Sequence, residues 1–413
     1  MNTENLLKQI LHPNNLNQAY LQVKRNKGAA GVDGMTINEL GHYLKENGEE
    51  IKDQIRTRSY QPKPVKRIEI PKADGGVRNL GVPTVVDRFI QQAMAQVLTP
   101  IYEEKFHENS YGFRPGRCAE MAIIKSLEFM NDGYTWIVDI DLEKFFDKVN
   151  HDKLMRLISN TIKDGDVISL IRKFLVSGGT PQGGNLSPLL SNIMLNELDQ
   201  ELEARGLNFV RYADDCLILV KSEKAAKRVM KSMTKYLEET LGLKVNVTKS
   251  KVERPSGIKF LGFGFFWDKN AYQFKAKPHQ ISIMRVKEKL KRLTRRSWSV
   301  SFDYRLKKLK QLIIGWVNYF KIAKMRTVCG NLDKNIRFRL RMCIWKQWKK
   351  VQTKYRSLMR LGIDKDKAWE WANTRKGYAR VARSFILCRT ITNERLKRRG
   401  LVSLLDHYQT VHI

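Results

Sequence analysis

The residues most able to do chemistry are two acidic clusters, each beside a short run of apolar, strand-forming residues. The first cluster holds Asp139 and Asp141, and the second is the adjacent pair Asp214 and Asp215. Ionised carboxylates in such surroundings are costly unless a cation neutralises them. Carboxylate oxygens are the ligands that Mg²⁺ prefers, and Mg²⁺ also binds substrate phosphates. Two such ions activate an attacking 3′-hydroxyl and stabilise a leaving pyrophosphate, so the clusters indicate nucleotidyl transfer.

Two points in this interpretation stay open at the level of sequence. Asp139 and Asp141 are two residues apart, so both face the same side of a strand. We favour Asp141 as the metal ligand because of the residues that follow it, with Asp139 as the alternative. Taken alone, Asp214-Asp215 is also typical of an ordinary hairpin turn. None of the seven histidines lies within a few residues of this pair, so the chemistry is expected to need no histidine base.

The pattern around the clusters predicts an α+β body followed by an α-helical, basic region that starts near Lys277. The first 60 residues are expected to be helical, with a glycine-rich break at Gly28–Gly34. Val65–Ile70 and Val77–Val82 alternate like two strands joined by a turn at Asp74–Gly76. Further helices are expected at 86–101, 151–176, 189–202 and 222–241, and further strands at 136–140 and within 209–220.

The positive charge is concentrated in the last third of the chain. The formal net charge is +34, and residues 281–413 hold 35 Lys and Arg against 8 Asp and Glu. Aromatic residues alternate with these cations, which indicates a polyanion partner rather than a surface that is merely soluble. We expect cations of this region to follow nucleic-acid phosphates. Those singled out are Arg295, Arg296, Arg337, Arg339, Arg341 and Lys346.

Several classes of protein are disfavoured by the sequence. No apolar run is long enough for a membrane span, and the N-terminus has no secretory signal pattern. The five cysteines are scattered without a C-x-x-C pair, which argues against a zinc site and a disulfide framework. We therefore expect no membrane, no zinc and a reducing, cytoplasmic location.

Four motifs in order resemble those of reverse transcriptases. Tyr212–Asp215 looks like the YADD box, and Asp141–Asp147 is similar to the acidic motif that precedes it in that family. Thr180–Leu189 resembles the loop that contacts template and nucleotide, and Gly257–Phe263 resembles the primer-grip hairpin. One four-residue box is weak evidence, but four boxes in family order are strong evidence.

Within that superfamily the chain most resembles bacterial group II intron reverse transcriptase/maturases, of the type that lacks an endonuclease domain. The matching segments are Gly28–Thr36, Pro71–Pro83, Ser110–Gly116 and Gly315–Phe320, the last similar to the maturase, or thumb, segment. The resemblance implies a right-hand polymerase with fingers, an antiparallel palm sheet and a helical thumb. The implied domains are an N-terminal extension of the fingers (1–62), fingers and palm (63–276), thumb (277–350) and a basic nucleic-acid-binding region (351–413).

The resemblance also implies roles for individual residues. Asp141, Asp214 and Asp215, with the backbone of Leu142, would bind two Mg²⁺ ions, for which Mn²⁺ is a substitute. Phe146 would exclude a 2′-hydroxyl from the sugar pocket, although the adjacent Phe145 is an alternative. Nucleotide-binding roles fall to Lys72, Arg78, Arg114, Gln182 and Lys249. The primer grip would be Phe260, Leu261 and Gly262.

The implied activity is RNA-directed DNA polymerisation from an RNA or DNA primer with dNTPs, in a bacterial cytoplasm. Binding of group II intron RNA for splicing and intron mobility is also implied. The alternatives are an RNA-binding maturase with a vestigial polymerase centre, and a stand-alone reverse transcriptase of the defence type. One departure from the family pattern is the short segment before Thr180, where the family usually has about a dozen more residues. Contacts with template near Gly178 and Gly179 are the ones that this departure puts in question.

Overall fold

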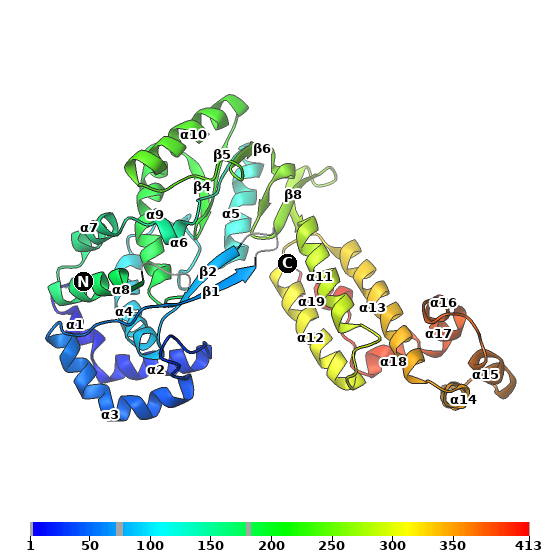
Figure 1. Cartoon of the computed structure of the whole chain (residues 1–413). Helices are drawn as coiled ribbons and strands as arrows, with labels where there is room; N and C mark the ends of the chain where they lie inside the picture. Colours follow the sequence, from blue (N-terminus) through cyan, green and yellow to red (C-terminus); the bar gives the residue numbers. More distant parts are fainter. Residues whose placement is uncertain (1–2, 72–76, 179–182, 413) are drawn as a thin grey trace. The chain divides into compact units, whose positions relative to one another are not determined.

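The computed structural model describes residues 3–71, 77–178 and 183–412. The chain forms two compact units, Met1–Arg254 and Pro255–Ile413, and each has its own sheet and its own helices (Figure 1). Among the residues described, every helix is too short or too polar to traverse a lipid bilayer.

A four-stranded antiparallel sheet is the frame of the first unit. Its order is β4 (Asn208–Tyr212), β5 (Asp215–Val220), β3 (Trp136–Ile140) and β6 (Lys251–Glu253). Alternate residues of these strands, such as Val138 and Ile218, enter the main core of the unit together with Val229 of α10 (Glu223–Lys235). The alternation of strand side chains thus buries one face of the sheet under helices.

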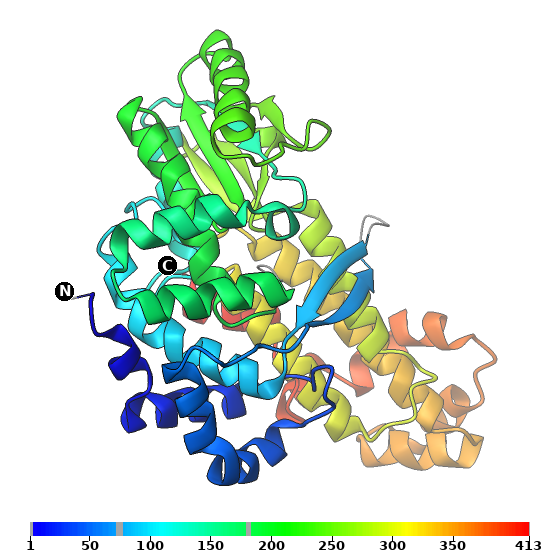
Figure 2. The same ribbon diagram turned by 60° about the vertical axis from the view of Figure 1, so that its left-hand side comes forward.

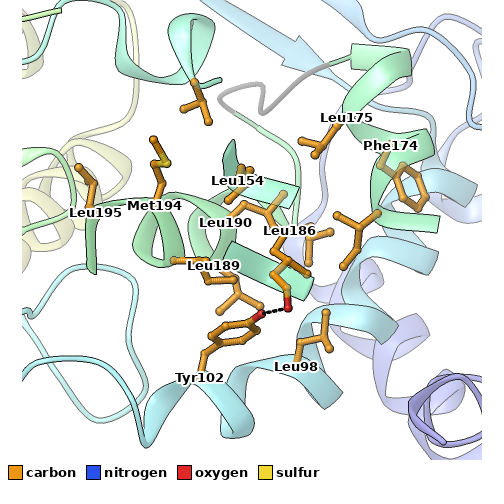
Figure 3. Close-up of a cluster of buried hydrophobic side chains, with 14 of the residues drawn as sticks. Leu98, Tyr102, Leu154, Phe174, Leu175, Leu186, Leu189, Leu190, Met194 and Leu195 are labelled. Carbon is orange, nitrogen blue, oxygen red and sulfur yellow. Dashed lines mark hydrogen bonds between the residues drawn. The ribbon is translucent and has the colours of Figure 1, made fainter. Parts of the chain in front are cut away.

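The helical core beside this sheet is built from α4 (Val85–Glu103), α7 (His151–Thr161), α8 (Gly165–Gly178) and α9 (Ser187–Ala204). Figure 3 shows their leucines converging, with the ring of Tyr102 at one edge of the cluster. The hydroxyl of Tyr102 donates to the carbonyl of Ile158 over 3.5 Å. A continuous helix was expected over 151–176, but the chain breaks between α7 and α8. There the buried carboxylate of Asp164 accepts hydrogen bonds from the N–H groups of Asp166 and Leu7.

The N-terminal helices and a two-stranded hairpin complete the first unit. The helices α1 (Leu6–Ile10), α2 (Pro13–Asn26) and α3 (Ile37–Arg56) lie beside α4 (Figures 1 and 2). The glycine-rich break is needed for close packing, because a Cβ on Gly31 would lie 2.7 Å from Cα of Thr84. The hairpin pairs β1 (Lys66–Pro71) with β2 (Val77–Val82) in antiparallel register, and the expected turn at 74–76 lies outside the described residues. The remaining helices are α5 (Ala119–Asn131), α6 (Phe145–Lys148) and a π-helical turn at Tyr236–Thr240 that continues α10.

The second unit begins with a three-stranded antiparallel sheet, β7 (Lys259–Phe260), β8 (Phe263–Asp268) and β9 (Gln273–Pro278). Three long helices follow, α11 (Gln280–Leu293), α12 (Phe302–Tyr319) and α13 (Arg326–Gln347). Buried residues from α13 to Leu396 form a separate apolar core that includes Trp345 and Trp371. The short C-terminal helices are α14 (Val351–Arg360), α15 (Lys365–Ala372), α16 (Tyr378–Arg383), α17 (Phe385–Thr390), α18 (Asn393–Arg398) and α19 (Leu404–Val411).

The expected fold class, an α+β body with an antiparallel sheet followed by a helical region, is confirmed. The domain boundaries that the resemblance implied stay a prediction.

Candidate active site

The pair Asp214-Asp215 is in a tight hairpin between β4 and β5. Tyr212 pairs with Asp215, so Ala213 and Asp214 are the only residues of the loop. Ala213 has a left-handed backbone with φ of 56°, which is unfavourable for a residue with a Cβ. The segment is a hairpin turn, and this does not exclude a catalytic role. Strained backbone conformations such as that of Ala213 are frequent at functional sites.

The register of the sheet brings Asp141 to the same end as this turn. Strand β3 pairs antiparallel with β5, and the last pair is Ile140 with Cys216. Continuing this register by one residue puts Asp141 opposite Asp215, and opposed residues of an antiparallel pair point to the same face. The backbone of Asp141 is fixed, since its N–H donates to Oγ of Ser250 (3.0 Å) and its carbonyl accepts from N–H of Asn246 (2.8 Å).

Asp139 has a different environment, inside the sheet rather than at its end. It pairs with Leu217 on one side and with Lys251 on the other. Burial raises the pKa of the Asp139 carboxyl to about 6; the charge of Asp141 acts in the same direction and that of Lys251 opposes it. Asp141 and Asp214 are half-buried, as is Asp139, and Asp215 is exposed, so position at the end of the sheet, and not exposure, separates the three residues from Asp139.

The donor set at this end of the sheet consists of carboxylate oxygens, which suits Mg²⁺ and not zinc. In the part of the chain that the structure describes, no three acidic, histidine or cysteine side chains are gathered closely enough to hold a metal. Like charges repel, so the side chains of the three aspartates are expected to converge only on a cation. Leu142, expected to contribute its carbonyl, lies in an isolated bridge with Val245, and its role stays a prediction.

A cavity of about 510 Å³ lies between the hairpin β1–β2, helix α6 and the end of α8. Phe146 lines this cavity, whereas Phe145 is buried in the main core with only 3 % of its surface exposed. The geometry therefore favours Phe146 over Phe145 as the ring that meets a sugar.

The other residues expected to bind nucleotide have varied surroundings. Lys72 and Gln182 lie outside the described residues, as do the three residues that precede Gln182. Arg78 belongs to β2, where it pairs with Ile70.

Arg114, expected in the same pocket, is turned into the protein. Its guanidinium donates to the carboxylate of Glu103 (2.8 Å) and to the carbonyls of His107 (2.6 Å) and Ser110 (2.9 Å). Lys249 is exposed on the segment whose neighbours Asn246 and Ser250 bind the backbone of Asp141. Its expected contact with phosphate stays a prediction.

The predicted primer grip belongs to the second unit. Phe260 pairs with Phe263, so Leu261 and Gly262 form a two-residue turn, and both have positive φ (49° and 83°) as such turns require. The turn is fixed by hydrogen bonds from the hydroxyl of Tyr319 to the carbonyl of Leu261 (2.8 Å) and from Oγ of Ser282 to that of Gly262 (2.8 Å).

Three residues near these sites were missed by reasoning from the sequence. Arg67 and Lys144 also line the cavity, and Lys144 has a left-handed backbone at the start of α6. Arg211 immediately precedes the YADD box and has no exposed surface. The sequence did contain one sign that Arg211 is special, since it is a cation that directly follows the apolar residues of a predicted strand.

Comparison with protein families supports the assignment made from the motifs. Residues 70–265 match the family described as reverse transcriptase (RNA-dependent DNA polymerase). Residues 283–362 match the group II intron, maturase-specific domain.

Curated relatives agree with these two matches. The protein YkfC of Escherichia coli K12 is 33% identical over 322 residues, which cover 65% of this chain and 84% of YkfC. The group II intron-encoded protein LtrA of Lactococcus lactis is 37% identical over 219 residues, half of this chain but only 36% of LtrA. Among solved structures, telomerase from Candida albicans is 14% identical over 90% of this chain and 69% of its own, with a TM-score of 0.42, too low to add to the argument. The chain therefore belongs to the reverse transcriptases that carry a group II intron maturase-specific domain, and it is an RNA-directed DNA polymerase.

Proposed function

We propose that Asp141, Asp214 and Asp215 form the polymerase centre of this chain, which extends a primer with dNTPs on an RNA template. The observation that carries the proposal is the register that continues β3 to Asp141 opposite Asp215, beside Asp214. Asp141, Asp214 and Asp215 would hold two Mg²⁺ ions, or Mn²⁺ in their place, which would lower the pKa of the primer 3′-hydroxyl and neutralise charge on the departing pyrophosphate.

The residues of the chain bind and orient the reactants. The primer 3′-hydroxyl loses its proton to water as its oxygen bonds to the α-phosphorus of the dNTP, and the bond from that phosphorus to the departing pyrophosphate breaks. Lys72 and Arg78 are proposed to bind the triphosphate. Arg67 and Lys144, which line the cavity, are proposed to add positive charge there. Gln182 is proposed to contact the nucleotide sugar, and Lys249 to help the pyrophosphate leave.

The test is extension of a DNA primer on an RNA template with dNTPs and Mg²⁺, with the wild type beside Asp214→Asn. We expect product from the wild type and a loss of at least about 10³-fold in the variant, since a metal clamp contributes several kcal/mol. RNA affinity should be equal in the two proteins. Tight RNA binding without extension by the wild type would instead favour a maturase with a vestigial polymerase centre.

We further propose that the second unit binds structured RNA, including group II intron RNA, in a bacterial cytoplasm. The excess of cations in the second unit and its match to the maturase-specific domain support RNA binding. The five free thiols of the chain support the reducing compartment. The expected phosphate contacts differ in exposure, and Arg337, Arg339 and Lys346 are half-buried. Arg295 and Arg296 are exposed, but Arg341 is 8 % exposed and donates to the carbonyl of Ile391 (2.9 Å), so Arg341 is mainly structural.

Replacing both Arg295 and Arg296 by Gln should therefore weaken RNA binding. Each lost phosphate contact lowers the slope of log affinity against log salt by about 1, so a total change of about 1 to 2 is expected. A filter-binding series from low to physiological salt measures this slope. Lys397→Gln is the control, because Asp406 already neutralises that ammonium at 2.9 Å. Equal slopes for the double variant and the control would contradict the proposal that Arg295 and Arg296 bind phosphates.

A second experiment, rescue of intron splicing in vitro, separates a maturase from a stand-alone reverse transcriptase.

A further inference from the structure

A fully buried ion pair contacts the YADD turn from inside the protein. Arg211 of β4 and Asp199 of α9 both have no exposed surface. The guanidinium grips the carboxylate with two parallel hydrogen bonds, Nε to Oδ1 at 2.7 Å and Nη2 to Oδ2. A bidentate pair of this kind fixes the direction of the guanidinium as well as its position.

The remaining arm of the same guanidinium binds the turn itself. Nη1 of Arg211 donates to the carbonyl of Ala213 (2.9 Å) and to Oδ1 of Asn192 (3.1 Å). Ala213 is the residue with the unfavourable left-handed backbone, and it immediately precedes Asp214. The hydrogen bond from Arg211 thus stabilises a conformation that alanine would not choose alone.

The loop that contains Tyr111 and Gly112 also contacts the turn and helps to fix it. The amide of Asn192 donates to the carbonyl of Gly112 (2.9 Å), so the residue that receives Arg211 also anchors this loop. A Cβ on Gly112 would lie 2.2 Å from the backbone nitrogen of Ala213, which means that the two backbones touch. The loop also pairs with β4, since N–H of Tyr111 donates to the carbonyl of Arg211 (2.9 Å).

A stability role alone is a poor explanation for this arrangement. Removing two charges from water is costly, and a buried ion pair can often be replaced by apolar residues of similar volume without loss of stability. What apolar residues cannot supply is a donor aimed at the carbonyl of Ala213. Metal ligands depend on such supporting contacts, whose loss typically weakens metal binding or activity by 10- to 100-fold.

We infer that Arg211, held by Asp199 and Asn192, is a positioning residue that sets the direction of Asp214 and Asp215 through the carbonyl of Ala213. The inference rests on the proposed function, because it gives the two aspartates their role at the metal site. Arg211 itself touches neither substrate nor metal.

The decisive variant is Arg211→Met combined with Asp199→Leu, which removes both charges and keeps an apolar filling. We expect it to fold but to melt roughly a few degrees below the wild type, because the carbonyl of Ala213 and Oδ1 of Asn192 lose their donor. It should need roughly tenfold more Mg²⁺ for half-maximal extension and lose roughly 10- to 100-fold in kcat. The KM for dNTP should change little. Independently of activity, the amides of residues 213–215 should exchange hydrogen faster in metal-free protein.

Two further variants separate the positioning role of Arg211 from a general loss of stability. Arg211→Lys retains the charge without the fork, so it should fold and still show the faster exchange and the higher Mg²⁺ requirement. Asp164→Ala removes a buried carboxylate that caps α8 and contacts neither the turn nor its supports, so it should lose stability without changing the Mg²⁺ requirement.

The outcomes separate this inference from the proposed function. Wild-type exchange at 213–215 and a wild-type Mg²⁺ requirement in Arg211→Lys, or in the double variant, would overturn the inference. A wild type that does not extend primers would overturn the proposed function, while the exchange measurement would still decide whether Arg211 fixes the turn.

Discussion

Replacing Asp141 by Asn is expected to abolish primer extension, with a loss of at least about 10³-fold, whereas Asp139→Asn should retain most of the rate. The two residues are two positions apart and face the same side, so the sequence favoured Asp141 only through the residues that follow it and kept Asp139 as the alternative. The register supports the proposal of Asp141, because Asp139 pairs with Leu217 inside the sheet while Asp141 continues past Ile140 to lie opposite Asp215.

The surroundings of Asp139 support the same distinction. Burial raises the pKa of Asp139 to about 6, so the charged carboxylate is costlier there than at an exposed aspartate, and Asp139→Asn removes a charge that burial disfavours. A carboxylate that binds Mg²⁺ must be ionised, and an amide supplies only one weaker oxygen in its place.

Single-turnover extension with saturating dNTP, over a range of Mg²⁺ concentrations, measures both variants. Thermal melting and RNA affinity serve as controls, since neither variant should change them greatly. A dead Asp139→Asn beside an active Asp141→Asn would reverse the assignment, and equal losses would mean that both carboxylates serve the metal site.

The local parts of the fold could be predicted because each depends on a short stretch of sequence. The hairpin β1–β2, the helix α9 and the strands around Asp214 are confirmed, since alternation and helical periodicity are local signals. The break between α7 and α8 was not predicted, although Asp164 caps α8 locally by accepting from N–H of Asp166 and Val167. Only its further bond from N–H of Leu7, 157 positions away, was beyond the reach of a local pattern.

Side-chain roles were harder to predict for the same reason. Arg114 belongs to a matched motif, yet its partner Glu103 is on α4, and no spacing rule links the two. The pair of Arg211 with Asp199 likewise joins a strand to a helix. Such contacts arise only when elements distant in sequence pack together, so a motif identifies the position of a residue and not the direction of its side chain.

The short segment before Thr180 has a counterpart in the structure. Helix α8 continues to Gly178, where a Cβ would lie 2.6 Å from Cγ1 of Val65, so the end of the helix packs closely against the base of the hairpin β1–β2. Val176 is 79 % exposed and lines the cavity that Phe146 also lines. The departure from the family pattern thus lies at the wall of the proposed nucleotide site, and not at the end of the four-stranded sheet where Asp141 lies opposite Asp215.

Phe146→Ala is expected to lower the preference for dNTP over rNTP by roughly 10- to 100-fold. Forcing an extra group against a packed ring costs about 1 to 3 kcal/mol, and each 1.4 kcal/mol corresponds to about a factor of ten. Phe146 lines the cavity, so its ring is available to clash with a 2′-hydroxyl, and alanine would remove that clash. Competing dNTP and rNTP in single-nucleotide extension measures the ratio of the two kcat/KM values.

The adjacent ring supplies the matched control for this prediction. Phe145 contacts Phe146 edge-on at a centroid distance of 5.3 Å but points into the core. Phe145→Leu nearly conserves apolar volume, so it should fold and keep the dNTP preference of the wild type. If Phe145→Leu lost the preference and Phe146→Ala kept it, Phe145, and not Phe146, would be the residue on which exclusion of the 2′-hydroxyl depends. If neither did, selection would depend on contacts other than an aromatic ring, and the cations Arg67 and Lys144 of the same cavity would be the next residues to replace.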